Sequence, residues 1–65
     1  MKVVKVSKIL SDLKRDGWVQ VHQVGSHRQF KHPTKKGKVT VNGGKADDVW
    51  GARLKSIESQ SGLEF

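Results

Sequence analysis

The chain has 65 residues, no cysteine and a formal net charge of +7 at neutral pH. This length predicts one small domain over residues 1–65, and the lack of cysteine excludes a disulfide framework and a thiolate metal site. No apolar stretch is long enough for a signal peptide or a membrane span, so we expect a soluble, cytoplasmic protein.

The charge is distributed unevenly along the chain. All six acidic residues lie outside residues 17–46, and this segment holds six lysine or arginine residues and all three histidines. Such a segment attracts polyanions. RNA, an acidic protein partner and a merely solubilising surface would each account for it.

The first predicted element is a helix over residues 7–16. Its apolar residues have the i, i+3, i+4, i+7 spacing of one helix face: Val6, Ile9, Leu10 and Leu13. Ser7 is expected to cap the N-terminus through its hydroxyl. Gly17 is expected to end the helix in the left-handed conformation.

Three strands are expected next, over residues 18–24, 26–32 and 38–41. Between the first two, Gly25 and Ser26 match a two-residue hairpin loop, with glycine first as a type II′ turn requires. Residues 33–37 have the composition of a second turn. Asn42 and the two glycines after it end the third strand.

Register and alternation predict a sheet with two different faces. The pairs expected across the hairpin are Val24 with His27, His22 with Gln29, and Val21 with Phe30. The core face is expected to contain Val19, Val21, Phe30, Val39 and Val41. The other face is expected to be open to solvent, and it carries Trp18, Gln20, His22, Val24, His27, Gln29, Lys31, Lys38 and Thr40.

A second helix is expected to follow, capped by Asp47 or Asp48 and ended by Gly62. Its apolar stripe contains Trp50, Leu54 and Ile57, and we expect Trp50 to be a core anchor rather than a contact for a partner. The element order is therefore α-β-β-β-α. It predicts an α+β fold in which both helices cover one face of a three-stranded antiparallel sheet.

The open face suits the cleavage of RNA. The ribose 2′-hydroxyl is an internal nucleophile, and histidine can remove its proton near neutral pH. His27 is the candidate acid/base group, and His22, diagonal to it, is a possible second one. The candidate phosphate contacts are Lys31, Lys38, Arg28, Lys35 and Lys36, although alternation points Arg28 toward the core side. No metal or other cofactor is expected, because the histidines are five residues apart and no carboxylate is near them.

The most distinctive part of the sequence is Gly25-Ser26-His27-Arg28-Gln29-Phe30-Lys31-His32-Pro33, which follows Asp16-Gly17-Trp18 and precedes Gly37-Lys38-Val39-Thr40-Val41. This pattern resembles the HicA toxins, small mRNA interferases of prokaryotic type II toxin–antitoxin systems. The resemblance implies a fold like that of double-stranded-RNA-binding domains. It also implies catalysis by the histidine of Gly-Ser-His, which is His27, and a HicB-type antitoxin that covers this surface.

Two other functions stay open at this point. The chain could be a non-catalytic RNA-binding module, because a basic sheet or helix can bind A-form RNA by shape. It could also be an interaction protein whose basic face serves only an antitoxin. Incubation with RNA in EDTA, followed by gel electrophoresis, distinguishes the three functions. A nuclease cleaves the RNA, a binding module retards intact RNA in the gel, and an interaction protein has no effect.

Overall fold

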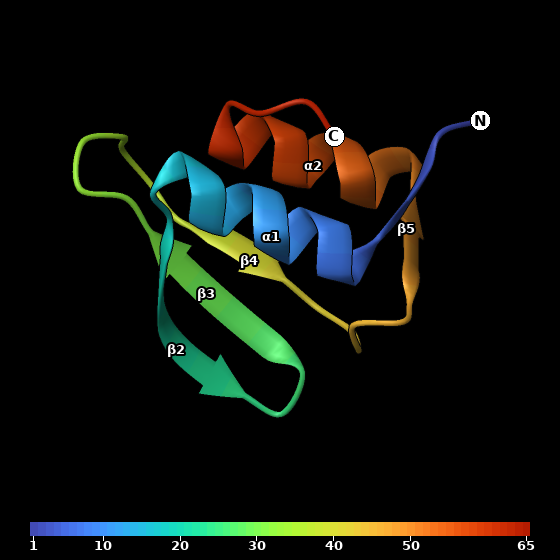
Figure 1. The fold of residues 1–65 in the computed structure, drawn as a ribbon, viewed down its shortest axis with the longest axis horizontal. Helices are drawn as coiled ribbons and strands as arrows, with labels where there is room; N and C mark the ends of the chain where they lie inside the picture. The colour runs from blue at the N-terminus through green and yellow to red at the C-terminus, as the bar shows by residue number, and fades with distance from the viewer.

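The computed structural model describes all 65 residues, and it confirms the predicted fold class. Both helices lie on one face of a three-stranded antiparallel sheet with strand order β2-β3-β4 (Figure 1). The elements in chain order are β1 Val3–Lys5, α1 Val6–Asp16, β2 Val19–Val24, β3 His27–Lys31, β4 Val39–Val41, β5 Asp48–Trp50 and α2 Gly51–Ser61.

The core lies between the two helices and the sheet. Ile9 and Leu13 of α1 pack with Leu54 and Ile57 of α2 against the buried residues of the strands, which are Val4, Phe30, Val39, Val41 and Val49. Both helices have 11 residues, and neither is long and apolar enough to cross a membrane.

Helix α1 begins without a side-chain cap, so the predicted role of Ser7 is wrong. The helix follows β1 directly, which places Ser7 inside its first turn. The free amides of Val6 and Ser7 donate instead to the backbone carbonyls of Asp47 and Lys45, at 2.9 and 3.1 Å. The C-terminus is as predicted, because Gly17 ends the helix with a φ of 104°.

Two short strands, β1 and β5, were not predicted, and they pair with each other. Because Asp48–Trp50 is a strand, alternation buries Val49 and turns Trp50 outward. Trp50 is 50% exposed, so its predicted place in the core is wrong. Neither Asp47 nor Asp48 caps α2, which begins at Gly51.

The β2–β3 hairpin has the predicted register next to its turn, and a different register further along. Val24 pairs with His27 and His22 with Gln29, as expected. A bulge at Val21 then shifts the alignment, so that Gln20 rather than Val21 lies opposite Phe30. A one-residue shift exchanges the two faces of a strand for every residue beyond it.

The bulge corrects the predicted faces at the start of β2. Trp18 is 2% exposed, although we expected it on the open face, whereas Val19 and Val21, expected in the core, are 58% and 53% exposed. Gln20 also lies on the helix side, with its amide donating to Gln23 Oε1 at 2.9 Å. A tryptophan buries about 150–250 Å², far more than a valine, so the hydrophobic effect favours the register that buries Trp18.

Candidate nucleic-acid interface

The face of the sheet that points away from the helices is called here the open face. Its members follow from the observed register and are Val19, His22 and Val24 of β2, His27, Gln29 and Lys31 of β3, and Thr40 of β4. None of them is acidic. Both helices lie on the other side of the sheet (Figure 1), and all of these residues except the half-buried Gln29 and Thr40 are exposed.

His27 is the first residue of β3, directly after the hairpin turn, and it is exposed. Gly25 has a φ of 58°, and Ser26 does not have a positive φ. This combination is that of a type II′ turn, which needs glycine at its first central position only. The turn places the imidazole of His27 at the end of the open face, where a long polymer can reach it.

His22 and Gln29 are the neighbours of His27 on the open face. They form a cross-strand pair next to the pair of Val24 and His27. His22 is therefore diagonal to His27, a relationship that separates two side-chain origins by about 7 Å. Gln29 lies opposite His22 and next to His27 on the same face of β3; it is half-buried, and its side-chain amide makes no hydrogen bond within the protein.

Three of the predicted phosphate contacts are exposed lysines that form no ion pair: Lys31, Lys36 and Lys38. Lys31 lies on the open face, four residues along β3 from His27. At about 3.3 Å per residue, this spacing is roughly 13 Å. Lys31 therefore adds a positive charge to the open face, well away from His27.

The other two predicted phosphate contacts bind other groups of the chain. Arg28 pairs with Val41 on the helix side of the sheet, as its alternation predicted, and its Nη1 donates to the carbonyl of Gly43 at 2.7 Å. Lys35 Nζ donates to Asp16 Oδ2 at 2.5 Å and to the carbonyl of Ser61 at 3.2 Å. The hydrogen bond and charge of Lys35 lower the pKa of Asp16 below its ordinary value.

His32 has a structural role that the sequence did not reveal. Its Nδ1 accepts the backbone amides of Thr34 and Lys35, both at 3.1 Å, so its proton resides on Nε2. Nε2–H in turn donates to the carbonyl of Asp16 at 2.7 Å. His32 therefore joins the turn after β3 to the end of α1, away from the open face, and it is not available for catalysis.

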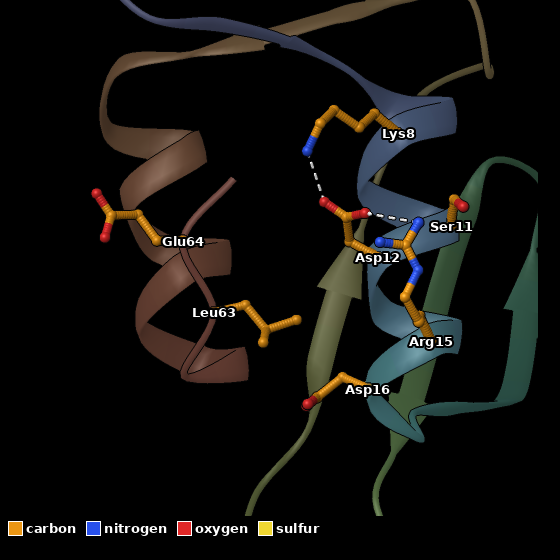
Figure 2. Close-up of a pocket in the computed structure, with 7 residues that line it drawn as sticks. All are labelled: Lys8, Ser11, Asp12, Arg15, Asp16, Leu63 and Glu64. Carbon is orange, nitrogen blue, oxygen red and sulfur yellow. Dashed lines mark hydrogen bonds and ion pairs between the residues drawn. The ribbon is translucent and has the colours of Figure 1, made fainter.

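The largest of the three hollows on the surface lies elsewhere. It measures about 630 Å³ and lies between α1 and the segment that follows α2 (Figure 2). Most of its charged groups form ion pairs with one another. Asp12 Oδ2 accepts a hydrogen bond from Lys8 Nζ at 2.6 Å, and Asp12 Oδ1 lies 3.6 Å from Arg15 Nη2. Asp16 at its end is paired with Lys35. The hollow is on the helix side of the sheet and does not contribute to the open face.

The structure brings His22, His27, Gln29 and Lys31 together on one uncovered surface. No group of three or more histidine, aspartate or glutamate side chains gathers to hold a metal ion. A family model described as "HicA toxin of bacterial toxin-antitoxin" matches residues 6–63. No curated protein matches the chain.

Proposed function

The chain belongs to the HicA toxin family of bacterial toxin–antitoxin systems, and we propose that it is a single-domain, metal-independent endoribonuclease. It would cleave mRNA in the cytoplasm and so inhibit translation and growth. The observation that carries this proposal is the position of His27: exposed, on an open face without acidic residues, with His22 diagonal to it and Gln29 beside both.

The proposed reaction uses the ribose of the RNA as nucleophile. His27 removes the proton of the 2′-hydroxyl, and the resulting oxygen attacks the adjacent phosphorus. The bond from phosphorus to the 5′-oxygen breaks, which leaves a 2′,3′-cyclic phosphate on one product. The departing 5′-oxygen takes a proton from His22, so that one histidine acts as base and the other as acid.

Two further groups support this reaction in the proposal. The free amide of Gln29 donates a hydrogen bond to a non-bridging phosphate oxygen, whose negative charge grows in the transition state. Lys31, Lys36 and Lys38 hold the RNA backbone on either side through their charges. Arg28 and Lys35 contribute less, because their side chains are already bound within the protein. A HicB-type antitoxin would inhibit the enzyme by covering the same face.

The test is cleavage of single-stranded RNA by purified protein in EDTA. His27→Ala should lower the rate by about 10²–10⁴-fold, the usual contribution of one acid/base group, without changing the circular dichroism spectrum. Val3→Ala serves as the control, because this exposed residue is on β1, away from the open face. Full activity of folded His27→Ala would exclude His27 from the mechanism. Retarded but intact RNA would favour the non-catalytic binding module.

A further inference from the structure

The two outer edges of the three-stranded sheet differ in how they are protected. At the β4 edge, side chains of α2 bind the outward backbone groups. Gln60 Oε1 accepts the amide of Thr40 at 3.2 Å, and Arg53 donates to the carbonyl of Asn42 at 3.4 Å. The β2 edge has no such cover, since β2 pairs only with β3 and no turn, loop or side-chain hydrogen bond reaches the backbone of residues 19–24.

The composition of β2 leaves this edge unusually attractive. β2 is the longest strand, with six residues, and all six are exposed. It contains no lysine, no acidic residue and no proline, the residues that usually protect an edge strand from pairing. Three of its residues are valines that are 53–63% exposed. Its one irregularity is the bulge at Val21, beyond which residues 22–24 stay in regular alignment with β3.

An apolar hollow lies at the beginning of the same edge. It measures about 400 Å³ and is formed between the C-terminal half of α1 and the start of β2. Leu10, Trp18, Val19 and Phe30 supply its apolar lining. A bare strand edge next to an apolar hollow is the arrangement by which proteins capture an extended segment: the backbone pairs with the edge, and a side chain fills the hollow.

We propose that the antitoxin binds this toxin by adding an extended segment to the β2 edge, beside residues 22–24, with an apolar side chain in the hollow next to Val19. This inference rests on the proposed function in one respect, which is that the partner is an antitoxin. It extends that function by naming the element that is bound and the chemistry of the segment that binds it. The segment carries acidic residues on the side that faces His27 and Lys31.

Charge distinguishes this occupant from a second copy of the chain. Pairing of two β2 edges would bring together two chains of net charge +7, each without an acidic residue in positions 17–46. Like charges brought together oppose association, whereas an acidic segment gains affinity and association rate from the same field. The bound segment would also cover one side of the open face, since Val24 is the cross-strand partner of His27.

The first measurement uses the unaltered toxin and its purified cognate antitoxin. In hydrogen–deuterium exchange, the outward amides of β2, which do not bond to β3, should exchange at least about 10-fold more slowly in the complex, because edge pairing gives them hydrogen bonds that they lack in the free toxin. Unchanged exchange in β2, in a complex that still inhibits the toxin, would overturn the proposal. So would concentration-dependent self-association of the toxin that protects β2 without the antitoxin.

The second measurement compares two lysine substitutions of equally exposed valines. Val21→Lys should weaken antitoxin binding at least about 10-fold, as for a residue at the centre of an interface, whereas Val3→Lys on β1 should change it less than about 2-fold. Because lysine adds a positive charge, binding held only by charge would not weaken, and equal affinity of the two variants would overturn the proposal. Antitoxin binding is measured by calorimetry, and RNA cleavage is measured in a separate assay. A chain that binds the antitoxin at the β2 edge but cleaves no RNA would refute the proposed nuclease function and leave the proposed binding mode supported.

Discussion

His32 and Trp18 pack edge to face, with their ring centroids 5.2 Å apart. The contact joins the residue after β3 to the residue before β2, so it closes the hairpin at the end opposite its turn. The indole N–H of Trp18 also donates to Asp16 Oδ2, at 3.2 Å. One end of the hairpin is thus anchored in the core, while the other end presents His27 to solvent.

The three histidines should therefore differ in their effect on stability. His32→Ala should lower the free energy of unfolding by about 1–3 kcal/mol, because the amides of Thr34 and Lys35 and the carbonyl of Asp16 lose their partner. His22→Ala and His27→Ala should each change it by less than about 0.5 kcal/mol, since both side chains are exposed. Urea melts followed by circular dichroism measure this difference, and equal losses in the three variants would contradict it.

A second stability contrast tests the bulge in β2. Phe30→Ala should cost about 3–5 kcal/mol, the usual loss for a large buried aromatic residue. Val21→Ala should cost less than about 1 kcal/mol, because Val21 is 53% exposed and opposes no residue of β3. The same melts apply. A loss at Val21 as large as that at Phe30 would mean that Val21 lies in the core and that the hairpin is regular.

The sequence predicted the elements better than it predicted which face each residue occupies. The periodicity of Ile9 and Leu13, the stop at Gly17 and the hairpin turn are local signals, and they identified the main elements correctly. Alternation, however, assumes an unbroken strand, and nothing in the sequence of β2 marks a bulge at Val21. The burial of Trp18 against His32 favours the observed register there, and that contact joins residues 14 positions apart.

The bulge also separates the parts of the candidate site that were predicted from those that were not. His22, His27 and Gln29 lie between the bulge and the turn, where the assumed register holds, so their shared face was predicted correctly. The engagement of Lys35 and His32 could not be predicted, because their partner Asp16 is 19 and 16 residues away. Lys35, which the sequence suggested as an RNA contact, is instead paired with a carboxylate of the same chain. The catalytic and RNA-binding roles themselves stay predictions.

Acid should destabilise the fold through two carboxylates. The hydrogen bond from Lys35 lowers the pKa of Asp16, and hydrogen bonds from Lys2 and the amide of Phe65 lower that of Glu58. A carboxyl whose pKa is lower in the folded state stabilises it above the ordinary pKa, near 4, and this contribution is lost as the pH falls through the folded value. The urea concentration at the midpoint of denaturation should therefore decrease as the pH is lowered from 5 to 2. The decrease should be less steep in Asp16→Asn.

A control for this experiment changes the net charge equally at an exposed site. Glu64→Gln removes one negative charge next to the C-terminus, where the side chain forms no ion pair. Its midpoint should decline with acid as steeply as that of the unaltered protein. If Asp16→Asn also declines as steeply, the bridge from Asp16 to Lys35 does not contribute to stability in solution.

The final prediction separates a lysine that is free for RNA from one that is not. Binding of labelled single-stranded RNA to His27→Ala protein, which should not cleave it, is measured by fluorescence anisotropy at several salt concentrations. With a few lysines bound to phosphates, we expect a slope of log K against log salt of about −2 to −4.

Adding Lys31→Gln to this variant should make the slope shallower by about 0.7, the contribution of one phosphate contact on a single strand. Adding Lys35→Gln should leave the slope unchanged, because Asp16 and the carbonyl of Ser61 already bind that ammonium. Equal changes for the two lysines would show that Lys35 leaves Asp16 to bind RNA, and a flat salt response would refute the electrostatic interface altogether.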